Sequence, residues 1–488
     1  MGKSAKDSKK LIIIGGGGAG LAAAVEAAEK GIKDITVIEK RSTVGGTSAI
    51  AGGIFACESP VQARLGIISN RDQLFKKALD WAHWSHLNPP VLRAFINKSG
   101  ETIKWLEDKG LEFDLITFYP GQNPPVQHNP RGFGAALIKV LENECLKNGV
   151  NILRNSAAKK LVRGDNGAIE GVQVVVDGKE TRFSCSSIII ATGGFAGNKE
   201  LMRRYFPDLK DGMVLSGLPL TGDGIDLAAE AGASIADTAT LVKEGPRVHM
   251  HTWPLLALER NGVTLWVDKC GERFTDEATG YHIFESVNAV MRQPEMACFM
   301  LLDSSVRRYF EEHGRKLRRP ADNDSFSGIR AELEKGIQDG VEKGTIKIAG
   351  NWEEIASWIG AESHTLIETV TRYNEYCKQG YDASFAKDRE YLIPLTEPPF
   401  YTVKTIVALL DTIGGINIDA KMCVMDREDK AIPGLYAAGV VTSGWESEIY
   451  CSELSASAFG FAINSGRIAA ENAATYLLSG SAPLKRFS

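Results

Sequence analysis

The chain opens with a glycine-rich stretch, residues 10–53, that is compatible with few folds. Residues 11–14 are a short apolar run, typical of a strand buried on both faces of a parallel sheet. The motif Gly15-x-Gly17-x-x-Gly20 follows, then a predicted helix over residues 21–30 and a second strand that ends in Glu39. In this order the glycines allow a tight turn, close approach of a pyrophosphate and close helix packing, and the carboxylate can bind a ribose diol. The stretch therefore predicts a dinucleotide-binding βαβ unit.

Composition excludes several classes of protein. The chain has 488 residues and a formal net charge of -5, so it lacks the basic excess typical of nucleic-acid binding. Its length suggests roughly two to four domains. The eight cysteines form no CxxC pair, which argues against a disulfide framework and against zinc, iron–sulfur or haem sites. We therefore expect no bound metal and no nucleic-acid partner.

The N-terminus imitates a secretory signal, because basic residues 3–10 precede an apolar, alanine-rich run. Glu26, Glu29 and Lys30 interrupt that run, which is also part of the nucleotide-binding unit. No segment offers about 18 uninterrupted apolar residues, the length that a membrane-spanning helix needs. The sequence therefore predicts a cytoplasmic protein with no membrane span.

Glycine-rich turns recur along the chain. Residues 44–53 place two glycine pairs around small hydroxyl residues, which suits backbone lying against a flat ligand. Residues 187–194 run from an apolar strand into glycines but lack the full motif, so we interpret them as part of the first nucleotide site. Residues 432–439 form another such turn, returning to the same sheet. Between them, residues 71–110 are predicted to be helical and residues 113–131 to form a proline- and aromatic-rich loop.

Several motifs together resemble the fumarate reductase and 3-ketosteroid dehydrogenase group of FAD-dependent oxidoreductases: GGGGAGLAAAVEAAEKG, VIEK, GGTSAIAGG, ATGGF, TGDGI, GERFTDE and IPGLYAAG. The resemblance runs over nearly the whole chain. It implies an α/β fold with a Rossmann-like FAD-binding domain of the glutathione reductase type. That domain would comprise residues 1–240 and 399–488, with residues 241–398 inserted as an α+β capping domain that binds substrate.

The same resemblance implies which residues bind each part of FAD. The pyrophosphate would contact Gly15, Gly17, Ala19 and Gly20, and the adenosine ribose would contact Glu39. The flavin and its ribityl chain would be lined by Thr47, Ser48, Gly52 and Gly53, with Asp223 and Gly439 on the ribityl side. The adenine half would lie near Ala158, Thr192 and Gly193, and the pyrimidine edge near Ser455 and Ala456.

Three departures from fumarate reductases bear on the substrate. Those enzymes place an arginine proton donor after the RFxxE segment, where this chain has Tyr281. They place a second arginine before the last helix, where this chain has Cys451-Ser-Glu453-Leu, and a histidine before the TxGG turn, where it has Asp411. A dicarboxylate gripped by arginine forks would have no partner at these positions. We therefore expect a substrate other than fumarate or succinate.

Three tyrosines instead resemble those of ketosteroid dehydrogenases: Tyr281, which stands where the first arginine would be, Tyr450 and Tyr119. The chemistry needs hydride exchange with flavin N5, a general acid/base at the neighbouring carbon and stabilisation of an enolate-like oxygen. Our hypothesis is that Tyr281 is the acid/base and Tyr119 assists it, while Tyr450 and Ser452 polarise the substrate ketone. A free tyrosine titrates near pH ~10, so a catalytic base would need neighbours that stabilise its phenolate.

The sequence thus predicts an FAD enzyme that interconverts an apolar, cyclic ketone, such as a 3-ketosteroid or a cyclohexanone, and its α,β-unsaturated enone. Direction stays open, as does the external electron partner, which could be a quinone, a carrier flavoprotein or another donor or acceptor. One alternative is an enoate reductase whose substrate carboxylate contacts His249, His251 or Arg131. Another is a non-catalytic electron-transfer flavoprotein.

Overall fold

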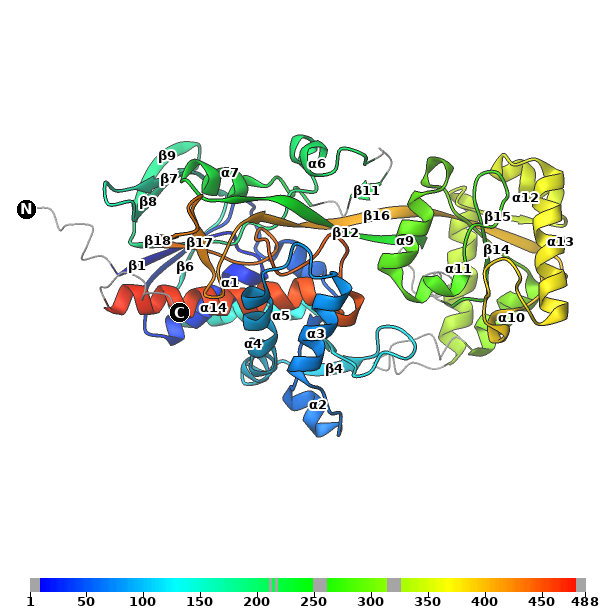
Figure 1. Cartoon of the computed structure of the whole chain (residues 1–488), viewed down its shortest axis with the longest axis horizontal. Coiled ribbons are helices and arrows are strands. Elements are labelled where there is room, and N and C mark those ends of the chain that lie inside the picture. The colour runs from blue at the N-terminus through cyan, green and yellow to red at the C-terminus, as the bar shows by residue number, and fades with distance from the viewer. Residues whose placement is uncertain (1–8, 210–212, 216–217, 249–260, 314–325, 480–488) are drawn as a thin grey trace, which may run out of the picture.

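The computed structural model describes residues 9–209, 213–215, 218–248, 261–313 and 326–479. The described residues up to 234 and from 417 onward form one part, which we call the main body, and the described residues between 261 and 399 form the other, which we call the cap (Figure 1). Two long strands, β12 (Ile235–Val248) and β16 (Phe400–Ile416), run between the two parts.

A six-stranded sheet forms the centre of the main body, in the order β17-β18-β10-β1-β2-β6. All neighbouring pairs are parallel except β17 with β18. The apolar runs 11–13 and 188–190 have no exposed surface and lie side by side, as expected for central strands covered on both faces. The strands are β1 (Lys10–Ile14), β2 (Asp34–Ile38), β6 (Asn151–Leu153), β10 (Ser187–Ile190), β17 (Cys423–Met425) and β18 (Ala431–Ala437).

Helix α1 (Gly18–Glu29) packs against α14 (Ser457–Ser479) and α5 (Phe133–Lys147) beside this sheet. The packing depends on glycine. A Cβ at Gly20 would lie 1.9 Å from the carbonyl oxygen of Gly15, and a Cβ at Gly466 would lie 2.2 Å from that of Ala19. Because those neighbours are backbone atoms that cannot move aside, side chains at these two positions would push α1 away from β1 and α14.

Two small sheets and several helices complete the main body. Strands β3 (Ile54–Phe55), β4 (Phe113–Ile116) and β5 (Gln127–Pro130) form one sheet; β7 (Ser156–Arg163), β8 (Ile169–Val176) and β9 (Lys179–Ser184) form the other. The helices are α2 (Pro60–Arg64), α3 (Arg71–Trp81), α4 (Pro89–Glu107), α6 (Lys199–Tyr205) and α7 (Asp223–Glu230).

The expected helical region 71–110 is confirmed as α3 and α4. The expectation of one loop over residues 113–131 is wrong at its ends, because β4 pairs with β5 and leaves only residues 117–126 as loop. Neither segment shows the apolar alternation that predicts a strand, because Phe113–Ile116 has only four residues and Gln127–Pro130 is polar and ends in proline.

The cap has its own apolar core, separate from that of the main body. Its strands β14 (Phe299–Leu302) and β15 (Ile346–Ala349) both pair with β16, and β13 (Leu265–Val267) pairs with β14. Strand β11 (Val214–Leu215), which precedes the cap in the chain, pairs farther along β16. Its helices are α9 (Ile283–Met291), α10 (Ser304–His313), α11 (Phe326–Glu342), α12 (Trp352–Ile359) and α13 (Ser363–Gln379). The arrangement agrees with the predicted α/β fold.

A buried ion cluster anchors the RFTDE segment inside the cap. Glu277, with a fully buried side chain, accepts hydrogen bonds from Arg273 at 2.8 Å and is paired with Lys387 at 2.9 Å. Arg273 also pairs with Asp382 at 2.8 Å. The cluster holds the start of the segment that leads to Tyr281 and α9.

The expected division after residue 240 falls inside β12, and that after residue 398 falls just before β16. These boundaries stay a prediction. Within the ranges described above, every helix is too short or too polar to cross a bilayer.

Candidate functional site

The first glycine turn leaves open space beside Gly17, at the N-terminus of α1; we call this space the Gly17 cradle. Gly17 has an extended backbone with φ -79°, and a Cβ built there would meet only the carbonyl oxygen of Gly45, at 3.9 Å. The backbone conformation at position 17 therefore does not require glycine, and there is open space beside it. Nearby, the hydroxyl of Ser48 accepts a hydrogen bond from the Gly18 N–H over 3.1 Å. Open space at a helix N-terminus suits a pyrophosphate.

Glu39, at the end of β2, faces the same turn. Its buried carboxylate accepts hydrogen bonds from the N–H groups of Gly16 and Arg41, both at 2.8 Å. The next residue, Lys40, donates to Asp223 at 2.9 Å. Asp223 thus lies beside the residue predicted to bind the adenosine ribose, although the resemblance assigned it to the ribityl side; its role stays a prediction. Ala158 lies half-buried on β7, which follows β6 of the central sheet.

Thr192 provides a second sign of a ligand site. Its hydroxyl is buried and has no hydrogen-bond partner among the described residues. An unpaired buried hydroxyl is costly, and a bound ligand would satisfy it. Gly193, next in the chain, has a left-handed φ of 80° that favours glycine. Together with the cradle at Gly17, this orphaned group fits a dinucleotide.

The remaining residues predicted to contact the flavin lie on three segments. Ser48 and Thr47 lie on the short 3-10 helix Gly46–Ile50, which Gly52 and Gly53 follow. The hydroxyl of Ser455 accepts a hydrogen bond from the side chain of Gln122 over 3.1 Å, and Ala456 has a left-handed φ of 64° immediately before α14. Gly439 donates its N–H to Ser465 and approaches Ala19, whose Cβ would lie 3.1 Å from a Cβ at position 439.

Three of the four predicted catalytic residues belong to one cluster between the 117–126 loop, α9 and the segment before α14. The hydroxyl of Tyr119 donates a hydrogen bond to Glu453 over 2.5 Å, and Lys77 donates to the other oxygen of that carboxylate over 2.7 Å. The adjacent Ser452 donates to Glu285 over 2.8 Å. We call Lys77, Tyr119, His282, Phe284, Glu285, Tyr450, Ser452 and Glu453 the Tyr119 cluster.

Aromatic rings line one side of this cluster. The rings of Tyr119 and His282 lie 4.5 Å apart, and so do those of Phe284 and Tyr450. Phe118 stacks on Phe284 at 6.0 Å. The oxygen of Tyr450 accepts a hydrogen bond from the Ala458 N–H over 2.8 Å, which fixes it at the start of α14. Flat apolar rings thus lie beside two carboxylates.

Tyr281 lies elsewhere. Its hydroxyl donates to the carbonyl oxygen of Asn261 over 3.1 Å, and its ring lies 5.9 Å from that of Tyr391, also in the cap. The structure therefore brings Tyr119, Tyr450 and Ser452 into one cluster and presents His282, not Tyr281, to Tyr119. Whether Tyr281 acts in catalysis stays a prediction.

Sequence reasoning missed five members of the cluster: Lys77, His282, Phe284, Glu285 and Glu453. His282 and Glu453 each follow directly after a residue that was chosen, so allowing one residue of uncertainty in register would have included them. Lys77 and Glu285 lie on ordinary amphipathic helices, and no local pattern distinguishes them.

The environment keeps the tyrosines protonated. Burial, followed by the hydrogen bond to Glu453, raises the pKa of Tyr119. Burial likewise raises the pKa of Tyr450 and that of Tyr281. The pKa of Glu453 is lowered: burial opposes ionisation, but the hydrogen bonds from Lys77 and Tyr119 outweigh it. The cluster therefore pairs a phenol with an ionised carboxylate.

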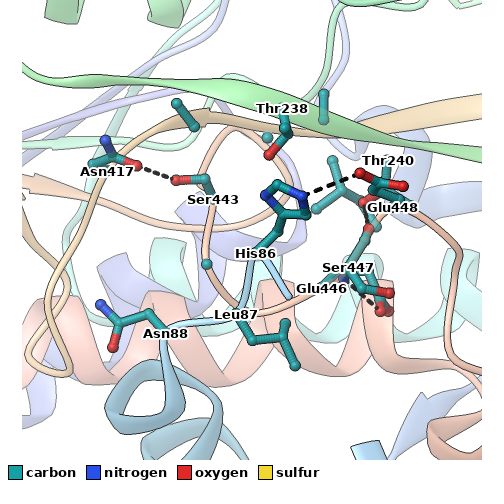
Figure 2. A pocket seen from close by; sticks show the side chains of 15 residues that line it. His86, Leu87, Asn88, Thr238, Thr240, Asn417, Ser443, Glu446, Ser447 and Glu448 are labelled. Atoms are coloured by element: carbon teal, nitrogen blue, oxygen red, sulfur yellow. Dashed lines mark hydrogen bonds and ion pairs between the residues drawn. The ribbon is translucent and has the colours of Figure 1, made fainter. Parts of the chain in front are cut away.

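A cavity of about 210 Å³ lies beside residues 443–448, which precede Tyr450 in the chain; Figure 2 shows the residues that line it. Polar side chains from β12, from the 443–448 segment and from residues 86–88 line it, with His86 paired to Glu448 over 3.1 Å. Glu446 lies at its wall, accepts hydrogen bonds from the N–H groups of Ser447 and Cys451, and has its pKa raised by burial to about 8. Glu446 thus links the wall of the cavity to Cys451, whose chain neighbours Tyr450 and Ser452 belong to the Tyr119 cluster.

Of the residues considered for a carboxylate substrate, only Arg131 lies in the described part of the chain. Arg131 is exposed on the surface and pairs with Glu112 and Asp114. His249 and His251 lie outside the described residues.

Comparison with known proteins is consistent with this geometry. The model of the FAD binding domain family matches residues 10–448. A vinyl phenol reductase of Lactiplantibacillus plantarum is 28% identical, over 96% of this chain and 97% of its own. A fumarate reductase (cytochrome) of Shewanella frigidimarina is 27% identical, over 96% of this chain and 78% of its own. A solved structure of a 3-ketosteroid-delta4-(5alpha)-dehydrogenase from Rhodococcus jostii has the same fold, with a TM-score of 0.71 at 22% identity, covering 95% of this chain and 96% of that one.

Proposed function

Because this chain belongs to the FAD binding domain family, as an FAD-dependent oxidoreductase of the fumarate reductase and ketosteroid dehydrogenase group, we propose that it reduces a C=C bond in an uncharged, ring-containing substrate. The bond would be conjugated to a ketone, as in a cyclic enone, or to a phenol. The relative that acts on vinyl phenols, which matches over nearly the whole of both chains, supports the second form.

The make-up of the Tyr119 cluster carries this proposal. Its cation is Lys77, which already neutralises Glu453, and its second carboxylate, Glu285, is hydrogen-bonded to Ser452. A substrate carboxylate would be repelled by these acids and would meet no guanidinium fork among their partners. The rings of Phe118, Phe284 and Tyr450 instead support binding of a flat apolar ring.

FAD, when bound, supplies hydride transfer. We assign its binding to the residues named by the resemblance: the Gly17 cradle for the pyrophosphate, Glu39 for the ribose and the Thr192 hydroxyl for a buried polar atom of the cofactor. The fit of the cradle and of that unpaired hydroxyl supports the assignment. Electrons would come from an external donor.

Within this proposal Tyr119 is the acid. Its raised pKa keeps the phenol protonated near neutral pH. When the hydroxyl turns from Glu453 to the substrate, Tyr119 therefore has a proton to give to carbon, which favours the reductive direction. Tyr450 would orient or polarise the substrate oxygen. The Ser452 hydroxyl is donated to Glu285, so we assign Ser452 to holding that carboxylate.

The test is anaerobic reoxidation of the reduced flavoprotein. The purified protein is reduced with one equivalent of dithionite and mixed with cyclohex-2-enone, 4-vinylphenol, fumarate or acrylate, while flavin absorbance is followed. We expect the enone or the vinylphenol to restore the oxidised spectrum and the two acids to leave it bleached. Rapid reoxidation by an acid alone would contradict the proposal.

A further inference from the structure

The carboxylate of Glu453 connects a half-buried phenol to a solvent-exposed ammonium. Its Oε1 accepts from the Tyr119 hydroxyl at 2.5 Å, and its Oε2 accepts from Lys77 Nζ at 2.7 Å. The side chain of Lys77 is 44% exposed and that of Glu453 is 26% exposed. The three groups therefore form an unbroken hydrogen-bonded chain from solvent to the hydroxyl of Tyr119.

We propose that Lys77 and Glu453 are a proton relay that reprotonates Tyr119 from solvent after each turnover. This inference rests on the proposed function, because it takes Tyr119 as the acid in C=C reduction. It adds two residues, from α3 and from the segment before α14, that need no contact with the substrate.

Each turnover takes up one proton from solvent through the relay. When the O–H bond of Tyr119 breaks and its proton forms a C–H bond on the substrate, a phenolate remains. Lys77 transfers a proton to Oε2 of Glu453, the carboxyl group rotates, and the new O–H proton passes to the phenolate. The neutral amine of Lys77 then takes a proton from water. One proton moves from solvent to carbon, and no electrons move within the relay.

The other charged groups near Tyr119 do not provide such a path. Glu285 bonds to Ser452 through one oxygen, and its second oxygen is buried without a hydrogen-bond partner among the described residues. His282 contacts Tyr119 through its ring face and lies 3.9 Å from Glu285. Burial raises the pKa of the neighbouring Cys451 thiol, which keeps its proton. Glu453 is the group that links both Tyr119 and a surface cation.

The loop carrying Tyr119 is fixed independently of the relay. Gln122 donates to Ser455 over 3.1 Å and accepts from the Phe118 N–H over 2.8 Å. Replacing Glu453 should therefore leave the loop in place and remove the proton path, which makes the variant informative.

The experiment uses holoenzyme variants Glu453→Gln and Lys77→Met, with Lys76→Met as control because Lys76 is exposed on the same helix. Each is kept reduced by an excess of reduced methyl viologen and supplied with the alkene that the wild type turns over. Consumption of the viologen gives the rate of repeated turnover, and a pH-indicator dye reports proton uptake. We expect Glu453→Gln to slow turnover and proton uptake about 100-fold with little change in KM. Lys77→Met should slow both less, with the loss shrinking as pH falls.

Rescue by small acids distinguishes a proton relay from a structural role. Small added acids such as acetic acid should accelerate Glu453→Gln and not the wild type or Lys76→Met, which a purely structural role would not produce. Wild-type rate and pH profile in Glu453→Gln or in the surface variant Lys77→Met would overturn the relay while leaving the proposed function intact. A wild-type protein that reduces none of the alkenes would overturn the proposed function itself, and the relay with it.

Discussion

The hydroxyl of Thr47 donates a hydrogen bond to a carboxylate oxygen of Asp411 over 3.0 Å, across 364 residues of sequence. Thr47 lies on the segment predicted to line the flavin, and Asp411 occupies the position before the TxGG turn. Asp411 is 5% exposed, and burial raises its pKa to about 7. An acid that changes charge near neutral pH thus contacts the predicted cofactor segment.

Asp411 should make stability depend on pH. Because its pKa is higher in the folded protein than in the unfolded chain, its contribution is full below about pH 4 and is lost as the pH rises to about 7, by at most about 1.4 kcal/mol per pH unit. Asp411→Asn keeps the shape and removes the charge. We expect the urea midpoint of the wild type to fall more between pH 5 and pH 8 than that of the variant; equal slopes would contradict the assignment.

Gly17→Ala tests the pyrophosphate cradle. The backbone φ of -79° suits alanine and the nearest atom to its Cβ lies 3.9 Å away, so the protein should fold normally. The methyl group would occupy space assigned to the ligand, and we expect FAD affinity to fall at least about tenfold. Flavin content after gel filtration and a fluorescence titration measure it. Gly350→Ala, where a Cβ meets open space in the cap, is the control and should retain FAD fully.

Tyr119→Phe and Tyr281→Phe separate the two candidate acids. The Tyr119 hydroxyl contacts Glu453, whereas that of Tyr281 contacts a cap carbonyl. We expect Tyr119→Phe to lower kcat about 100-fold and Tyr281→Phe to remain near wild type, with both proteins still yellow. Steady-state kinetics decide it: the reverse ranking would restore Tyr281 as the acid and remove Tyr119 from that role.

Lys387→Met should weaken the cap. The ammonium of Lys387 is fully buried, paired with Glu277 and hydrogen-bonded to Thr264 and Tyr373. Removing it leaves Glu277 with less compensation, for which a loss of about 3 kcal/mol in the free energy of unfolding is expected. Urea unfolding followed by tryptophan fluorescence measures it. Lys335→Met, at an exposed cap lysine, should change the midpoint little, and an equal loss there would argue against a specific buried pair.

The cofactor-binding unit could be predicted from sequence because its signal is local. The turn after β1, the glycine at position 20 that α1 needs and the acid at the end of β2 follow one another within 30 residues. The resemblance then linked distant glycine turns, and the central sheet indeed brings β1, β10 and β18 side by side.

The acid/base cluster could be predicted only in part, because it is assembled across the chain. The choice between Tyr281 and His282 depends on which way one turn of 3-10 helix, Glu277–Tyr281, points its last side chain, and that is set by packing against Tyr391. Lys77 and Glu453 are 376 residues apart, so no spacing rule connects them. The pairing of β4 with β5 was missed for a different reason, because neither of these short strands shows apolar alternation.

Strand β16 joins the cap to the main body as one uninterrupted piece of 17 residues. Its first half is hydrogen-bonded to β14 and β15, and its second half to β12. At this crossing the cap and the main body therefore share one continuous strand, with no loop between them. A change in the tilt of the cap relative to Tyr119 would therefore have to bend β16 together with its partner β12.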